Sequence, residues 1–396
     1  MLVHIEELLN LPEISVYSYT IEQTEIKIEC TSRFEVAVCP CCLTVCSEVK
    51  MYYTKSVRDL SMNGKAVILA LKERQFHCPE CGAYFIERFG FVDPFRTMTR
   101  RYEGYIYGLC KGASIKQVSL QENLLWDVVQ EIFTRYAAAE LEQEGRHQGV
   151  RWLGIDEIAV KKGHKDFVAV LIDLERACVI DVLEQRNKDF IIKYLRENYD
   201  QEFFDRIEAF SCDMWAGFVG VAKELMPNAT IVIDRFHVVK QVHKALNDYR
   251  KTLRKDFPND ENLKRLRWIL LKRAEDLSPE EKTRLEQAFS SCPLLEQVYQ
   301  LKETFRKIFD AQVSRETGEY LLDLWVTQAN ALNIPALNTF LKTLTRWNEF
   351  ILNYFLKRIS NGIVEGINNL IKTLKRQAYG YANFQHFRQR ILITCQ

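Results

Sequence analysis

The sequence of 396 residues lacks three features that assign many proteins to a class at once. No apolar run approaches the ~18 residues of a membrane-spanning helix. The N-terminus, MLVHIEELLNL, has neither the basic segment nor the apolar core of a signal peptide, so we expect neither secretion nor membrane insertion. Net charge is also lacking, because 54 Lys and Arg stand against 53 Asp and Glu. On first inspection this balance argues against a nucleic-acid partner, because proteins that bind nucleic acids usually carry an excess of basic residues.

Composition and length indicate an ordinary globular protein of several domains. Hydrophobic residues make up 47% and charged residues 27% of the chain. This composition can form ordinary hydrophobic cores, so it excludes an intrinsically disordered protein and a chain dominated by an acidic tail. At about 150 residues per domain, the length predicts two to four domains.

Cysteine is the first informative residue type, because seven of the twelve cysteines fall within the first 81 residues. Two C-x-x-C pairs, Cys39–Cys42 and Cys78–Cys81, are separated by 35 residues. A strand-like segment precedes each pair. In a chain without a signal peptide, four such thiolates favour one structural Zn²⁺ in a zinc ribbon. Surface thiols with a redox C-x-x-C are the alternative, and Cys41 and Cys46 leave the exact first pair open.

The next segment predicts three helices. Thr97 to Gly112 has helical spacing with Gly112 as its stop, and Ser114 with Gln117 matches a capping box. A third helix, with Asn123 as its N-cap, carries one apolar stripe: Leu125, Val129, Ile132 and Tyr136. A helix-turn-helix and a plain three-helix bundle both fit this pattern. Residues 143–149 are then typical of a linker.

Beyond the linker the apolar period becomes that of strands. The pattern predicts strands over residues 152–160, 167–174, 177–183, 207–211 and 230–233, with helices over 188–198 and 215–225. Three consecutive strands followed by helix, strand, helix and strand indicate a ribonuclease-H-like mixed sheet rather than a doubly wound sheet.

Two acidic residues occupy informative places in this sheet. Asp156 interrupts the apolar first strand, and Asp213 directly follows the fourth. A carboxylate in an apolar strand is costly unless it is paired or binds a cation, and two converging carboxylates can hold Mg²⁺. Asp173, Asp181 and Asp234 also end strands, so position alone leaves a structural role open for each acid.

Residues 238–354 have almost wholly helical patterns, which predicts an all-helical insertion into the strand domain. A C-terminal helix then places Ile363, Ile367, Leu370 and Leu374 on a core face. A second face of the same helix carries one acid among amides and cations: Asn361, Glu365, Asn369, Lys372 and Arg376. This face suits a metal ion beside a phosphate backbone, although a solvated polar face has the same pattern.

Several runs now resemble one protein family. The runs are Gly154–Glu157, Ser211–Trp215, Asp234–Val238, Asn353–Phe355 and Asn361–Gly380. Together they resemble the DDE transposases of bacterial insertion sequences, in the family labelled ISL-three, over nearly the whole chain. The resemblance implies a zinc segment, a helix-turn-helix and a ribonuclease-H-like catalytic domain, with Asp156, Asp213 and Glu365 as ligands of catalytic Mg²⁺ or Mn²⁺. The long stretch between Asp213 and Glu365 departs from the compact spacing of many DDE enzymes, and an inserted helical domain explains it. Asp234 is the rival of Glu365, because it also ends a strand of the sheet.

The resemblance sets the expected domains and partners. The predicted domains are a zinc ribbon (1–95), a helix-turn-helix (96–145), a catalytic core (150–240 and 355–396) and a helical insertion (241–354). The expected partners are terminal inverted repeats and target DNA, bound by a homodimer or larger synaptic complex in the bacterial cytoplasm, with nucleoid association when on DNA. The candidate DNA-binding residues are Asn361, Asn369, Lys372 and Arg376. A non-catalytic zinc-dependent regulator and a ribonuclease-H-like nuclease or resolvase remain alternatives.

The near-zero net charge is a sum over unlike segments. Residues 1–38 hold seven acids against two Lys and Arg, whereas residues 235–275 carry twelve Lys and Arg against five acids. Residues 357–390 carry seven Lys and Arg against Glu365 alone. Basic residues are therefore concentrated beside the predicted active site, where the release of counterions from DNA supplies affinity. The total charge does not exclude a nucleic-acid partner.

Overall fold

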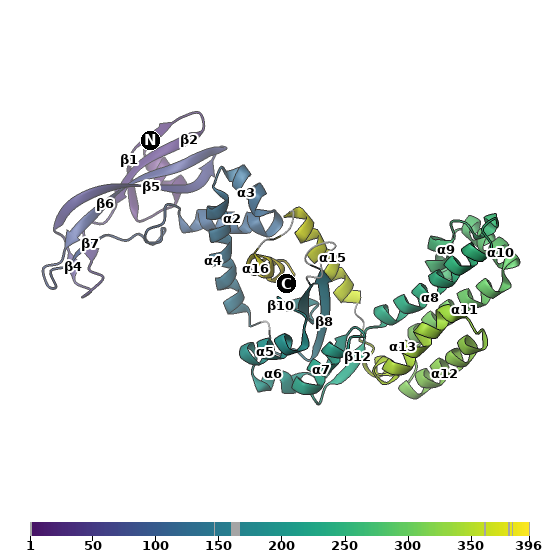
Figure 1. Cartoon of the computed structure of the whole chain (residues 1–396). Helices are drawn as coiled ribbons and strands as arrows, with labels where there is room; N and C mark the ends of the chain where they lie inside the picture. Colours follow the sequence, from purple (N-terminus) through teal and green to yellow (C-terminus); the bar gives the residue numbers. More distant parts are fainter. Residues whose placement is uncertain are drawn as a thin grey trace. The chain divides into compact units, whose positions relative to one another are not determined.

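A computed structural model describes residues 2–145, 147–159, 167–359, 362–378, 381 and 383–395 (Figure 1). The chain divides into two compact units, Met1–Glu140 and Leu141–Gln396. Among the described helices, none combines the length and the apolar character that crossing a bilayer requires.

The first unit is built on a five-stranded sheet in the order β1-β2-β6-β5, with β7 added to β6. Its elements are α1 (Leu2–Leu9), β1 (Ile14–Ile21), β2 (Glu25–Ser32), β5 (Val49–Met62), β6 (Lys65–His77) and β7 (Tyr84–Ile86). β2 and β6 are parallel, and the other pairs are antiparallel. A small hairpin of β3 (Ala37–Val38) and β4 (Val45–Cys46) carries the first cysteine pair. The sequence indicated strands beside the cysteines but not this larger sheet.

Three helices complete the first unit: α2 (Arg100–Gly112), α3 (Ile115–Glu122) and α4 (Trp126–Glu144). Ser114 caps α3 as predicted, accepting a 3.3 Å hydrogen bond from the Gln117 amide. Two sequence predictions are wrong. Asn123 is not an N-cap but ends α3 in the left-handed conformation, with φ 53°, which a short polar side chain tolerates. Gly112 is the last residue of α2, whose cap is the extended Ala113.

The predicted apolar stripe of the third helix is confirmed only in part. Val129 and Ile132 are buried, but Leu125 precedes α4 and is 76% exposed. The stripe therefore starts one turn later than the sequence pattern indicated, because Leu125 belongs to the turn between α3 and α4.

The second unit contains the predicted mixed sheet, in the order β10-β9-β8-β11-β12. The strands are β8 (Trp152–Ala159), β9 (Phe167–Asp173), β10 (Cys178–Leu183), β11 (Ala209–Cys212) and β12 (Thr230–Ile233). β8, β9 and β10 are antiparallel neighbours, whereas β8, β11 and β12 run parallel. The parallel strands need crossover helices, which are α5 (Lys188–Asn198), α6 (Gln201–Arg206) and α7 (Ala216–Leu225). This is the ribonuclease-H-like order, so the predicted fold class is confirmed.

A helical insertion follows β12 and extends to one end of the unit in Figure 1. Its helices are α8 (Arg235–Asp256), α9 (Arg267–Leu271), α10 (Pro279–Ser291), α11 (Pro293–Asp310), α12 (Arg315–Ala331), α13 (Pro335–Leu352) and the short α14 (Tyr354–Lys357). One apolar stripe at helical spacing is buried over α13 and α14: Phe340, Leu344, Trp347, Ile351 and Tyr354.

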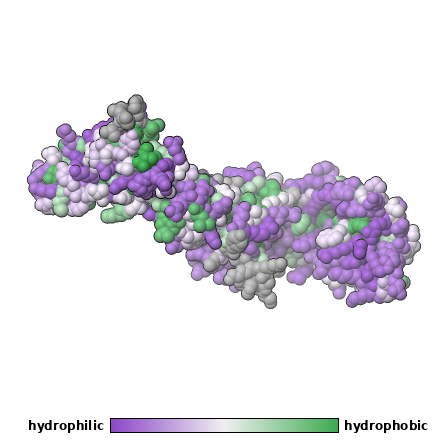
Figure 2. Space-filling model, turned by 90° about the horizontal axis from the view of Figure 1, so that it is seen from above, coloured by the Kyte–Doolittle hydropathy of each residue, from purple (hydrophilic) through white to green (hydrophobic). Residues whose placement is uncertain are grey.

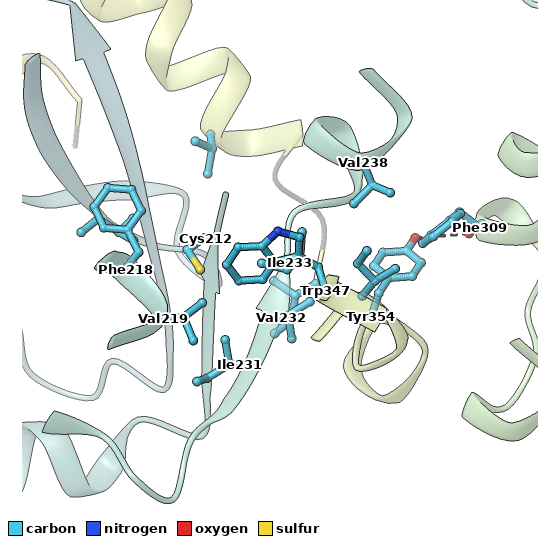
Figure 3. Packing of buried hydrophobic residues seen from close by; sticks show 14 of the residues in the cluster. Cys212, Phe218, Val219, Ile231, Val232, Ile233, Val238, Phe309, Trp347 and Tyr354 are labelled. Atoms are coloured by element: carbon cyan, nitrogen blue, oxygen red, sulfur yellow. Dashed lines mark hydrogen bonds between the residues drawn. The ribbon is translucent and has the colours of Figure 1, made fainter. Parts of the chain in front are cut away.

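The insertion is joined to the sheet by a continuous apolar contact, seen in Figure 3. Val232 and Ile233 of β12 lie in one buried cluster with Trp347 and Tyr354 of the insertion. The side-chain amide of Asn353 also donates a 2.8 Å hydrogen bond to the Ile231 carbonyl. Because this contact surrounds the end of β12, it fixes the start of α8 beside the carboxyl ends of the parallel strands.

Two helices end the chain, α15 (Gly362–Gln377) and α16 (Phe384–Thr394). The predicted core face of α15 is partly wrong, since Ile363 and Leu370 are 37% and 39% exposed. The buried face is instead Val364, Ile367, Asn368, Ile371 and Leu374. Both faces share Ile367 and Leu374, so the apolar spacing could not separate them. The observed rotation brings Asn368 to the sheet.

Candidate active site and zinc ribbon

The four predicted zinc ligands meet in the first unit. The Sγ atoms of Cys39, Cys42, Cys78 and Cys81 all lie within 4.8 Å of one another. Sγ–Sγ distances are 3.6 Å for Cys39 and Cys81 and 3.4 Å for Cys42 and Cys78. A zinc tetrahedron with bonds of about 2.3 Å has edges of about 3.8 Å, so these thiols fit one Zn²⁺. Neither Cys41 nor Cys46 belongs to this group, which answers the question that the sequence left open.

Each cysteine pair folds in the same turn. The amides of Leu43 and Gly82 donate 3.0 Å hydrogen bonds to the carbonyls of Cys39 and Cys78, respectively. Both donors are left-handed, with φ of 63° and 73°. Hydrogen bonds with the hydroxyl of Thr44 and, to a smaller extent, with its backbone amide lower the pKa of Cys42 to about 6. A lower pKa favours the thiolate, which is the form that binds zinc. The backbone thus prepares both turns for a metal.

Asp156 and Asp213 occupy corresponding places on two neighbouring parallel strands of the second unit. Ser211 of β11 pairs with Gly154 of β8, and each acid lies two residues beyond that pair. The same register therefore brings the two carboxylates side by side, with Asp156 within β8 and Asp213 directly after β11, as the sequence placed them. Asp156 is buried, and its Oδ1 accepts a 2.8 Å hydrogen bond from the Glu157 amide.

Asp213 has the most perturbed carboxylate of this site. Burial, and after it the charges of Glu157 and Asp156, raise the pKa of Asp213 to about 6. Its Oδ1 atom is buried and has no hydrogen-bond partner among the described residues. A buried carboxylate that lacks a partner and faces like charge is what a cation would stabilise.

Asn368 is the α15 residue that reaches this pair, and sequence reasoning missed it. Its Nδ2 donates a 2.5 Å hydrogen bond to Asp156 Oδ2. Its Oδ1 is buried without a hydrogen-bond partner within the described chain. The sequence offered only a weak signal for Asn368, a single amide among apolar residues. It was overlooked because the buried face of the helix was predicted from a different set of apolar residues.

The third predicted acid, Glu365, lies one turn before Asn368 and is exposed. It lines a cavity of about 350 Å³, together with its rival Asp234 and the cations Arg235, Lys302 and Arg306. The three predicted carboxylates are not gathered into one tight group: in the described ranges, only the four cysteines place three or more metal-binding atoms within 4.8 Å of one another. The structure thus brings Asp156 and Asp213 together and leaves Glu365 beside Asp234.

Three further predicted residues lie on α15, and one residue that was not predicted lies on α8. Asn369, Lys372 and Arg376 are exposed on α15, which fits both a DNA-binding face and a solvated polar face, and Asn361 lies outside the described residues. His237, near the start of α8, was also missed. Burial lowers the pKa of His237 below 6.5, while the charge of Asp156 acts in the opposite direction, so the imidazole lies within the field of Asp156.

Comparison with known proteins agrees with each block of the chain. Residues 153–391 match the DDE transposase domain of family ISL3. Residues 35–81 match the zinc-finger of transposase IS204/IS1001/IS1096/IS1165, and residues 87–137 match the helix-turn-helix domain of transposase family ISL3.

Individual relatives carry the same description. The transposase for insertion sequence element IS1001 of Bordetella parapertussis is 27% identical over 361 residues, 89% of this chain and 87% of the relative. The transposase for IS1557 of Mycobacterium tuberculosis is 26% identical over 287 residues, 66% of this chain and 64% of the relative. A chain of the Drosophila P element transposase strand transfer complex aligns with a TM-score of 0.39 and 14% identity, covering 78% of this chain and 93% of that chain.

The three family matches, together with the ribonuclease-H-like sheet order, define a DDE transposase with a zinc ribbon and a helix-turn-helix. The chain belongs to the ISL3 family, the ISL-three family that its motifs resembled, so the predicted family is confirmed.

Replacing Cys78 with Ser should abolish zinc binding, because three thiolates cannot close the tetrahedron. Metal analysis of the purified chain should find a single zinc ion in the wild type and a near-complete loss in the variant. Cys41→Ser is the matched control, since Cys41 is exposed and outside the cluster. Zinc retained by Cys78→Ser, or lost by Cys41→Ser, would contradict this ligand set.

Asp213→Asn should stabilise the magnesium-free chain near neutral pH. Because the folded-state pKa of Asp213 is about 6 against an ordinary 3.8, the folded chain holds this proton more tightly than the unfolded chain. Stability therefore falls as pH rises from about 4 to about 6 and stays lower above that window. We expect the uncharged variant to melt a few degrees higher at about pH 7.5, with no gain at about pH 4.

Asp181→Asn is the control for this measurement. Asp181 accepts 2.7 Å hydrogen bonds from Arg388 Nε and from the Tyr194 hydroxyl, so its loss should lower the melting temperature at about pH 7.5. A melting temperature of Asp213→Asn that is unchanged or lower at that pH would show that the Asp213 charge is not destabilising.

Proposed function

We propose that this transposase cleaves DNA at the ends of its insertion sequence and joins the freed ends to target DNA, using Mg²⁺ or Mn²⁺ held by Asp156, Asp213 and Glu365. The observation that carries the proposal is the buried oxygen of Asp213, which lacks a partner among the described residues and faces the charge of Asp156. Divalent ions bound there would supply a Lewis acid that stabilises charge on the reacting phosphate and lowers the pKa of water.

The side chains around the acids support this assignment. Asn368 and the Glu157 amide each donate a hydrogen bond to Asp156, which holds its carboxylate in one orientation. Arg186 forms an ion pair with Glu157 and so offsets the charge of an acid that acts on Asp213. Asp156 and Asp213 are therefore available to bind a cation, with Glu365 as the proposed third ligand.

The chemistry consists of two displacements at phosphorus. Water attacks the phosphodiester at the element's end, and the 3′-oxygen leaves and takes a proton. The freed 3′-hydroxyl then attacks a phosphodiester of target DNA, loses its proton, and expels the target's own 3′-oxygen. No covalent bond to the protein is formed in either step. The exposed cations of α15, Lys372 and Arg376, are suited to hold the DNA backbone beside the acids.

Recognition and assembly complete the proposal. The zinc ribbon and the helix-turn-helix would read the terminal inverted repeats. Since two ends must be joined in one reaction, we propose a homodimer or larger synaptic complex. The protein would act in the bacterial cytoplasm, on DNA of the nucleoid.

Asp156→Asn should abolish strand cleavage while DNA binding persists, because the variant keeps the volume of the side chain and loses its charge. We expect a drop of about 10³-fold or more in cleavage of a labelled duplex carrying one end of the element. Asp156→Cys should cleave with Mn²⁺ but not with Mg²⁺, because a thiolate binds the softer ion. Asp173→Asn is the control and should retain cleavage, because Asp173 pairs with Leu153 at the end of the β8–β9 pair, outside the proposed site.

The same assay separates the alternative functions. Cleavage without joining of labelled ends to a target plasmid would indicate a nuclease or resolvase. Binding of the repeats with no metal-dependent nicking would indicate a regulator. Full cleavage by Asp156→Asn would overturn the proposed site.

A further inference from the structure

A basic groove lies at the far end of α8, away from the acidic pair. Its volume is about 600 Å³, and every side chain that lines it is a cation: Arg250, Lys251, Arg254, Lys255, Lys264 and Arg265. No acidic side chain shares this lining. Figure 2 shows that the end of the molecule formed by the insertion is largely hydrophilic.

Two segments build the groove. Four of the cations, at 250, 251, 254 and 255, share one face of α8 because they are spaced by one and four residues. Lys264 and Arg265 come from the segment before α9, which the buried Leu263 and Leu266 anchor. Arg265 is left-handed, with φ 57°, a conformation that residues other than glycine adopt at a cost.

Ordinary structural roles do not account for this cluster. Cations in the last turn of a helix stabilise its dipole, but that applies to Arg254 and Lys255 alone. Like charges four residues apart on a helix destabilise it. Burial lowers the pKa of Arg250, and the charges of Arg267 and Arg254 lower it further, which shows how closely the cations are crowded.

Few acids offset the charge. Lys251 pairs with Asp248 at 2.6 Å and Lys264 with Glu261, both at the exposed surface. Within the described part of the chain, Arg254, Lys255 and Arg265 have no salt bridge. The groove is therefore complementary to a polyanion.

The lining indicates which polyanion. It contains no aromatic residue on which a base could stack and no amide that could read a base edge. The neighbouring Trp268 is 68% exposed but does not line the groove, and the Arg267 guanidinium lies 4.7 Å from its ring centroid. Lys and Arg alone contact phosphates without regard to sequence.

We propose that this basic groove holds the phosphate backbone of duplex DNA about eight base pairs from the cleaved phosphate, an assignment that rests on the proposed function. α8 begins beside the acidic site, directly after its N-cap Asp234. The groove is centred some 18 residues further along the helix. At 1.5 Å per residue this is about 27 Å, or about eight base pairs at 3.4 Å each. The DNA would run along α8 (Figure 1).

The test compares two triple variants of the full chain with equal loss of charge. The groove variant is Arg254→Gln, Lys255→Gln and Arg265→Gln. The control is Lys282→Gln, Lys307→Gln and Lys342→Gln, three exposed lysines of the insertion outside the groove. Binding of a duplex carrying one element end is measured between about 50 and 200 mM salt, together with cleavage at saturating protein and low salt.

The groove variant should bind about tenfold or more weakly, and its plot of log affinity against log salt should be shallower by about 2 to 3. Scrambling the DNA sequence near the eighth base pair should not alter the loss of affinity. Shortening the duplex to fewer than about eight base pairs on the side of the cleaved phosphate that reaches the groove should remove the difference between the two variants. Saturated cleavage should match that of the control.

Three results would overturn the proposal: equal binding by the two variants, a deficit that survives on every shortened duplex, or a deficit confined to single-stranded DNA. Failure of the proposed function is a separate outcome. In that case the wild-type chain would not cleave the DNA, regardless of how tightly the groove variant binds it.

Discussion

The arrangement of the second unit depends on one electrostatic constraint, the placement of two carboxylates side by side in a buried sheet. Asp156 and Asp213 are brought together by the parallel register of β8 and β11, which the apolar residues of both strands fix. Two such charges repel and are poorly solvated, as the raised pKa of Asp213 records. A site of this kind persists only because the surrounding core is stable enough to hold it without a cation.

The rest of the unit supports that pair from several directions. α15 supplies the amide of Asn368 to Asp156, and Lys375 of the same helix donates a 2.8 Å hydrogen bond to the Ala159 carbonyl at the end of β8. The apolar contact between β12 and Trp347 makes the helical insertion continuous with the sheet core. This contact directs α8 from the acidic site to the basic groove, so one helix connects the proposed catalytic site with the groove that we propose binds DNA.

Much of this could be predicted from the sequence, because the informative signals were local. The alternation of apolar residues located five strands and their order, and Asp156 stood out as a charge within an apolar run. The spacing of Cys39, Cys42, Cys78 and Cys81 was sufficient to identify the ribbon. Wherever two local patterns competed, the sequence could not choose: Asn123 suits either end of a helix, and α15 carries two overlapping apolar stripes. Asn368 was missed for the same reason, since its role depends on a strand more than two hundred residues away.

The central claim is that Asp156 and Asp213 form a divalent-metal site, and anomalous diffraction from a crystal soaked in Mn²⁺ tests it most directly. The account predicts an anomalous peak between these two carboxylates, within about 2.0–2.3 Å of an oxygen from each. The same map would show whether Glu365 or Asp234 supplies the third carboxylate. A well-occupied peak elsewhere in the unit, with none between Asp156 and Asp213, would contradict the account.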